Sequence, residues 1–112
     1  MAKPQTPETR LKRAVVQLLK TYRIVTWPLT AGMGSHPGLP DRFGVLQGGR
    51  LLAIEFKRPA GVSETGRKIP QGELSDDQIR VKEQIEAAGG LYIVCRSLDD
   101  IFTGLGLGGR LF

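Results

Sequence analysis

The sequence is poor in cysteine and histidine, and it contains no long apolar run. Its single cysteine, Cys95, excludes a disulfide framework and a cysteine-based metal site, and the apolar residues 91–94 beside it indicate a buried thiol. No stretch approaches the roughly 20 apolar residues that span a membrane. The first residues also lack an apolar signal core. We therefore expect a cytoplasmic protein with no membrane partner.

Acidic residues are outnumbered by basic ones. The chain has 16 lysines and arginines against 11 aspartates and glutamates, which gives a net charge of +5 and a pI near 9.8. This balance favours a polyanionic partner such as nucleic acid. With 112 residues, 40% of them hydrophobic, we expect a single domain over 1–112 with a flexible tail at 1–6.

Helix signals occur in three places. Thr6 before Pro7 is a typical helix start, and apolar residues then recur at spacings of three and four. Ser75 and Gln78 have the spacing of a capping box. Ser97 is positioned to cap a third, short helix. The expected helices run over 7–21, from 76 to the glycines at 89–90, and over 98–103.

Strand signals lie between these helices. The expected strands cover residues 24–27, 43–47, 50–57 and 91–96. Residues 30–40 are interpreted as a loop, 58–73 as a mobile basic loop without periodicity, and the glycine-rich end as lacking clear regular structure. The order α-β-β-β-α-β-α predicts an α/β fold, a mixed sheet with helices packed on it.

The middle strands form a predicted hairpin. A tight turn at Gly48-Gly49 would place Phe43 opposite Ile54 and Val45 opposite Leu52. This register places Asp41 opposite Phe56 rather than opposite Glu55. Either a bulge shifts the register, or Asp41 lies in the turn after Pro40 and swings toward Glu55; we favour the second.

An acid ends the apolar run of the second hairpin strand. Alternation puts Glu55 and Lys57 on one face, where an exposed ion pair would contribute about 0 to 1 kcal/mol. The presence of Asp41 suggests a metal site rather than a simple ion pair, because two neighbouring carboxylates repel unless a divalent cation joins them. Mg²⁺ prefers such oxygen ligands, and a nearby lysine can position water for attack on a phosphodiester.

Three motifs in order resemble one nuclease family. "GLPD" at 38–41, "IEFKRP" at 54–59 and "LSDDQ" at 74–78, with Glu8 on a helix ahead of them, are similar to the VRR-NUC (virus-type replication-repair nuclease) group of the PD-(D/E)xK nucleases. The resemblance implies a restriction-endonuclease-like fold and a metal-dependent DNA endonuclease using Mg²⁺ or Mn²⁺. It further implies a standalone phage or bacterial protein, a homodimer, acting on branched DNA such as four-way junctions.

The resemblance also implies roles for single residues. Asp41 and Glu55 become metal ligands, with the backbone carbonyl of Phe56 as a third and Glu8 acting directly or through water. Lys57 positions water or stabilises charge.

Gln78 matches the glutamine that orients such a site. Arg42 departs from the pattern, which has an apolar residue there, and this leaves the start of that strand less defined. His36 has no counterpart in the pattern.

Each assignment has a simpler alternative. Glu8 suits the first turn of any helix, Gln78 is explained by the capping box, Asp41 by a turn after proline, and His36 by a surface loop. The cations Arg58, Arg67 and Lys68 are candidate phosphate contacts or solvated loop charges.

Alternatives also exist for the whole chain. It could be a non-catalytic DNA-binding or assembly module with a vestigial acidic site. A nuclease acting on RNA is a third option. The apolar C-terminal residues could form a dimer interface or complete the core; they are Ile101, Phe102, Leu105, Leu107, Leu111 and Phe112.

Overall fold

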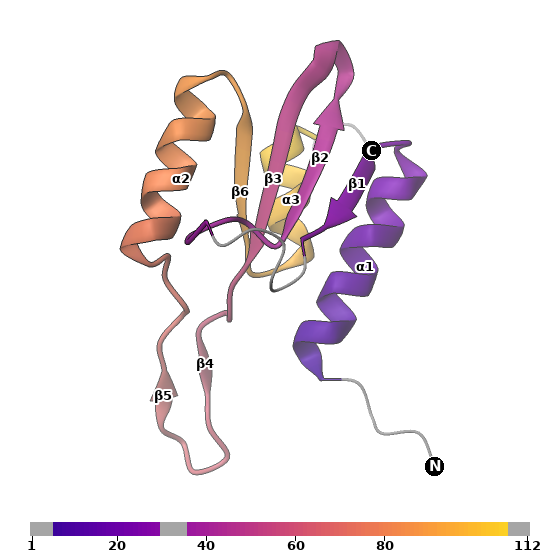
Figure 1. Ribbon diagram of the computed structural model, residues 1–112. Coiled ribbons are helices and arrows are strands. Elements are labelled where there is room, and N and C mark those ends of the chain that lie inside the picture. Colours follow the sequence, from indigo (N-terminus) through magenta and orange to yellow (C-terminus); the bar gives the residue numbers. More distant parts are fainter. Residues whose placement is uncertain (1–5, 30–35, 108–112) are drawn as a thin grey trace.

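A four-stranded mixed sheet organises the chain (Figure 1). The computed structural model describes residues 6–29 and 36–107. The strands are β1 (Val25–Pro28), β2 (Arg42–Leu46), β3 (Arg50–Phe56) and β6 (Leu91–Cys95), in the order β1-β2-β3-β6. β2 is antiparallel to both of its neighbours, whereas β6 is parallel to β3. The expected mixed sheet is confirmed.

Helices cover both faces of this sheet. They are α1 (Pro7–Thr21), α2 (Asp76–Ala87) and α3 (Leu98–Leu105). The core joins α1 and α3 to one face of the sheet and consists of Val15, Leu19, Leu52, Ile54, Phe56, Ile93, Cys95 and Ile101. α2 packs on the other face with Val81 buried. Within the described ranges, no helix has both the length and the apolar character needed to cross a membrane.

The sequence signals for the starts of α1 and α2 are confirmed. The Thr6 hydroxyl accepts a hydrogen bond from the Thr9 amide at 3.2 Å. α3 begins after Ser97 as expected, but the Asp100 carboxylate rather than the Ser97 hydroxyl accepts the hydrogen bonds at this start. α3 runs to Leu105, beyond the expected end, because Gly106 takes the positive φ that closes the helix. Ile101 is fully buried and Leu105 packs against the core, so part of the C-terminal apolar set completes the monomer. Leu111 and Phe112 lie outside the described residues.

The predicted hairpin register is wrong by one residue. Phe43 lies opposite Ala53 and Val45 opposite Leu51, because the connection is a three-residue turn, Gln47–Gly49, rather than a two-residue turn. Extending this register places Asp41 opposite Glu55, on the same face of the sheet. Neither a bulge nor a swing of Asp41 across the sheet is needed. β2 begins at Arg42, directly after it.

The expectation that residues 58–73 lack regular structure is also wrong. Two short antiparallel strands, β4 (Gly61–Val62) and β5 (Lys68–Ile69), form a hairpin that extends beyond the end of the main sheet (Figure 1). The Arg58 guanidinium ties its base together by donating to the Pro70 carbonyl at 2.8 and 3.2 Å. The segment was not recognisable as β structure because each strand is too short to show alternation.

Candidate active site

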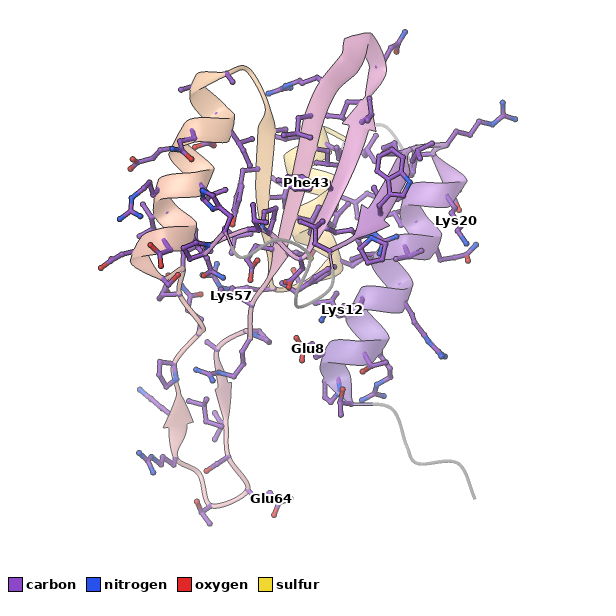
Figure 2. All side chains as sticks on the ribbon, in the orientation of Figure 1. Glu8, Lys12, Lys20, Phe43, Lys57 and Glu64 are labelled. Carbon is purple, nitrogen blue, oxygen red and sulfur yellow. The ribbon has the colours of Figure 1, made fainter. Side chains whose placement is uncertain are left out.

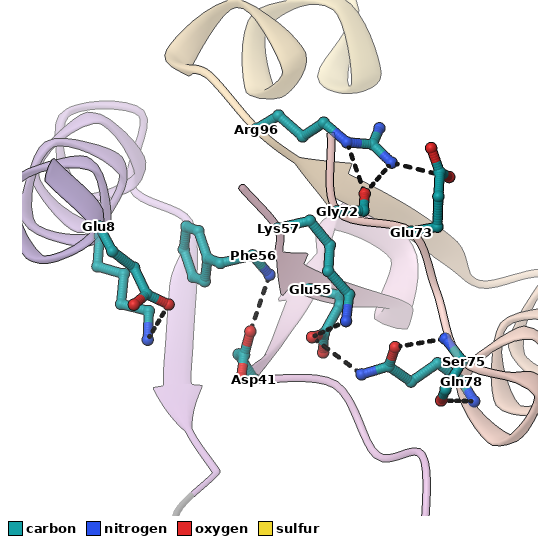
Figure 3. Close-up of polar contacts among 11 residues, drawn as sticks. Glu8, Asp41, Glu55, Phe56, Lys57, Gly72, Glu73, Ser75, Gln78 and Arg96 are labelled. Carbon is teal, nitrogen blue, oxygen red and sulfur yellow. Dashed lines mark hydrogen bonds and ion pairs between the residues drawn. The ribbon is translucent and has the colours of Figure 1, made fainter. Parts of the chain in front are cut away.

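Asp41 meets the end of β3 at the point where the β2–β3 ladder stops. Pro40 would face Phe56 in a continued ladder, but the paired residues end at Arg42 and Ile54, so the Phe56 amide needs another acceptor. The Phe56 amide instead donates to Asp41 Oδ2 at 2.8 Å (Figure 3). The Asp41 carbonyl accepts from the Leu29 amide at 2.8 Å, which holds its backbone against the chain after β1. These bonds fix the carboxylate beside β3.

Glu55 is buried beside Asp41, with 5% of its surface exposed. Its Oε2 accepts from Gln78 Nε2 at 3.1 Å and lies 3.7 Å from Lys57 Nζ. Among the residues that the structure describes, the buried side-chain atoms without a hydrogen-bond partner are Glu55 Oε1 and the Tyr92 hydroxyl. A buried carboxylate oxygen without a donor is costly, and either a proton or a bound cation would remove that cost.

The pKa of Glu55 is perturbed by its surroundings. Burial, followed by the charge of Asp41, raises the pKa of Glu55 from 4.5 to about 7, and the Lys57 ammonium offsets only part of this rise. Burial and the two carboxylate charges also raise the pKa of Tyr92, which keeps its hydroxyl protonated. The site therefore concentrates negative charge that a cation would neutralise.

Gln78 connects α2 to this site through both ends of its amide. Its Oε1 accepts from the Ser75 amide at 2.9 Å, and the Ser75 hydroxyl accepts from the Gln78 amide at 3.2 Å. Its Nε2 holds Glu55 (Figure 3). One side chain thus completes the predicted capping box and orients the buried acid.

The donor set suits a hard divalent cation. Asp41 and Glu55 supply carboxylate oxygens, and Glu55 Oε1 lacks any other partner. In an antiparallel ladder the N–H and C=O of one residue point to the same neighbour. The Phe56 carbonyl therefore faces the side of Asp41, as its amide does. Oxygen ligands in this number fit Mg²⁺ or Mn²⁺, which keep several waters when bound.

Glu8 is not brought together with these acids. In the part of the chain that the structure describes, no three acidic, histidine or cysteine side chains lie close enough to share an ion. The Glu8 side chain is 68% exposed and pairs with Lys12 at 3.4 Å. It borders a cavity of about 440 Å³ that Phe56 and Lys57 also line, and in Figure 3 it stands apart from Glu55. Its role as a ligand stays a prediction.

The three cations predicted to contact DNA lie at different places on the β4–β5 hairpin. Arg67 and Lys68 are exposed on the β4–β5 hairpin, whose tip carries Glu64 (Figure 2). Arg58 lies at the base, where it is engaged with Pro70. His36 is exposed and its ring contacts only the neighbouring Pro37 carbonyl among the described residues, at 3.0 Å.

Sequence reasoning missed two residues near the site. Tyr92 lies on the same face of the sheet as Glu55 because β6 pairs parallel to β3. No local sequence pattern predicts which strand β6 pairs with. Arg96 donates to the Gly72 carbonyl at 2.7 and 3.1 Å and contacts Glu73 at 3.3 Å (Figure 3). It thereby fixes the segment leading into α2. An arginine at the end of the predicted strand 91–96 was the one available signal.

Comparison with known proteins supports the fold independently. The chain is similar to a solved structure described as "VRR_NUC domain", with a TM-score of 0.63, 18% identity, and coverage of 96% of this chain and 100% of the other. No protein-family model and no curated protein matches the sequence. At this identity the likeness concerns the fold. The chain therefore has the fold of a VRR-NUC domain, a restriction-endonuclease-like mixed sheet flanked by helices.

Proposed function

We propose that the chain is a divalent-metal-dependent DNA endonuclease that hydrolyses phosphodiester bonds. The observation that carries the proposal is the pairing of Asp41 with buried Glu55 beside Lys57, in which one Glu55 oxygen has no other partner. The VRR-NUC fold supports the same class of activity.

Each residue has a role in this proposal. Asp41, Glu55 and the Phe56 carbonyl would hold the ion, with Glu8 joining directly or through water. When bound, the ion would supply an activated water and offset charge on the leaving oxygen. Lys57, held 3.7 Å from the Glu55 carboxylate, would position the attacking water or stabilise phosphate charge. Gln78 would keep Glu55 in one orientation.

The substrate contacts would come from the basic hairpin. Arg67 and Lys68 are exposed on β4–β5, close in sequence to Lys57 and beyond the end of the strand that carries Glu55. Phosphate contacts there would position a strand across the site without reading its sequence. Arg58 would contribute through its charge while it holds the hairpin base.

We further propose branched DNA, such as a four-way junction, as the substrate of a homodimer. A domain of 112 residues covers few base pairs. Cutting two strands of a junction therefore requires two active sites, which a two-fold axis would supply. Sedimentation of the free protein and of its junction complex would measure the number of chains.

Cleavage of labelled DNA tests the activity. Four-way junction, duplex, single-stranded and flap DNA are incubated with Mg²⁺, Mn²⁺ or EDTA. Wild type should cut in a metal-dependent manner, and Lys57→Ala should lose at least about 100-fold in rate. Lys20→Ala, an exposed lysine on α1, is the matched control and should cut normally.

The same experiment can contradict the proposal. A wild type that binds these DNAs but cuts none with either metal is a DNA-binding or assembly module with a vestigial acidic site. Cleavage of RNA in preference to DNA would agree with phosphodiester hydrolysis but contradict DNA as the substrate.

A further inference from the structure

Within residues 6–29 and 36–107, no helix covers half of one sheet face. α2 packs over β6 and reaches Glu55 of β3 through Gln78, whereas no described helix covers the β1–β2 half of the same face, and Figure 2 shows Phe43 there. On this half Trp27 is 52% exposed, Val25 57% and Val45 45%. Large apolar side chains exposed together next to a candidate active site commonly mark a binding surface.

The sheet register ties Trp27 to the carboxylates. Trp27 pairs with Phe43, so both side chains lie on one face, and Asp41 follows on the same face two residues along the strand. The bond from the Leu29 amide to the Asp41 carbonyl shows that this pairing continues. Trp27 is therefore the diagonal cross-strand neighbour of Asp41, at about 7 to 8 Å between backbones.

We propose that Trp27, flanked by Phe43, stacks an unpaired DNA base beside the phosphate that a metal ion bound by Asp41 and Glu55 would hold. This inference rests on the proposed function and narrows the proposed branched substrates to DNA with unpaired nucleotides at the cutting position. A half-exposed indole offers a flat apolar face, and base stacking on such a ring tolerates every base. In duplex DNA the base faces cover one another, so only an unpaired base can use this ring.

Charge decides between DNA and a second copy of the chain as the occupant. The net charge of +5 favours a polyanion on this face, and the homodimer proposed above would then form through another surface. The open face also continues directly into the carboxylate site, where a DNA strand would already be bound. A strand with its phosphate at Asp41 carries the same or the next base over Trp27.

Trp27 is the sole tryptophan of the chain, so intrinsic fluorescence reports on this ring alone. In EDTA, where no cutting occurs, the protein is titrated with a single strand of about 12 nucleotides. An abasic strand of equal length and a duplex of equal length are the matched ligands. The single strand should quench the emission, and the abasic strand and the duplex should bind with little quenching.

Substitutions separate stacking from general affinity. Trp27→Ala should weaken single-strand binding, measured by anisotropy of labelled DNA, by at least about fivefold, and Trp27→Phe should recover part of it. Val45→Ala, an exposed aliphatic on the same face, should change it less than about twofold. Duplex binding should be unchanged in all three variants.

Several outcomes would overturn the inference. Equal quenching by the abasic strand would show that phosphates alone act near Trp27. If Trp27→Ala binds single strands normally but sediments as a smaller species than wild type, the face is an interface between copies. Absence of any DNA binding would overturn this inference and the proposed function together. Base-dependent quenching without DNA cleavage in Mg²⁺ would contradict only the proposed function. DNA cleavage without base-dependent quenching would contradict only this inference.

Discussion

Glu55 is an ionisable group buried against a second acid, and its titration should make stability depend on pH. Burial and the Asp41 charge raise its pKa from 4.5 to about 7. The unfolded chain titrates near the ordinary value, so between about pH 4.5 and 7 the folded state holds more protons than the unfolded state. In metal-free buffer the free energy of unfolding should therefore fall as pH rises through this window, by roughly 3 kcal/mol.

Substitution of Glu55 by glutamine tests this assignment. By urea unfolding in EDTA, Glu55→Gln should equal wild type near about pH 5 and exceed its stability near about pH 8, because glutamine carries no charge to bury. Glu64→Gln, at the exposed hairpin tip, should keep the wild-type pH dependence. Strong destabilisation of Glu55→Gln near about pH 8 would indicate instead a structural ion pair with Lys57.

The central site residues were predictable from local chemistry, and their orientation was not. Glu55 stood out because an acid ending a buried apolar run needs a partner, and Lys57 and Asp41 were the available ones. The expected register placed Asp41 opposite Phe56, and a swing toward Glu55 was then invoked, because a two-residue turn was expected where a three-residue turn closes the hairpin. One residue of register reverses which face every side chain of a strand occupies.

At the level of elements, the start of α2 serves both folding and the site. Ser75→Ala removes the acceptor for the Gln78 amide, whereas Gln78→Ala removes the other half of the capping box and the bond to Glu55. Each should cost about 1 kcal/mol in urea unfolding. Only Gln78→Ala should also slow DNA cleavage, by about 10- to 100-fold. Equal loss of activity in both variants would mean that the helix start alone matters.

The β4–β5 hairpin should bind DNA phosphates, and substitutions of its basic residues should weaken DNA binding without unfolding the domain. Arg67→Ala and Lys68→Ala should each weaken DNA binding uniformly across sequences and reduce the slope of log affinity against log salt by about 1. Arg80→Ala, an exposed arginine on α2 paired with Asp77 at 2.9 Å, is the control and should keep the slope. An unchanged salt slope in both hairpin variants would show that Arg67 and Lys68 are solvated and do not contact DNA phosphates.

For the whole molecule, the element order followed from periodicity and capping signals, whereas the open face of the sheet could not be foreseen. The first strand was expected from its β-rich residues, but nothing in its sequence shows that Trp27 stays half exposed. That exposure depends on which strand lies at the sheet edge and on how far α2 reaches across the sheet. Both are properties of packing between distant segments rather than of local pattern.

A bound divalent ion should stabilise the entire domain, because only the folded sheet brings Asp41 and Glu55 together. A ligand specific to the folded state adds about 1.4 to 2.7 kcal/mol at 10 to 100 times its Kd. For a domain of this size that corresponds to a rise in Tm of roughly 5 to 10 °C. Calorimetry with Mn²⁺ at about pH 8 should show this rise in wild type, and a smaller one at about pH 6, where protons compete for Glu55.

Asparagine at position 41 keeps an acceptor for the Phe56 amide but removes the charge that would attract the ion. Asp41→Asn should therefore fold and lose the Mn²⁺-dependent rise in Tm. Asp99→Asn, at an exposed position in the first turn of α3, removes an acid without touching the site and should keep the rise. An equal rise in Asp41→Asn would show that Mn²⁺ acts elsewhere on the chain. In that case the carboxylate pair would not be the metal site, and the buried Glu55 oxygen would need a different partner.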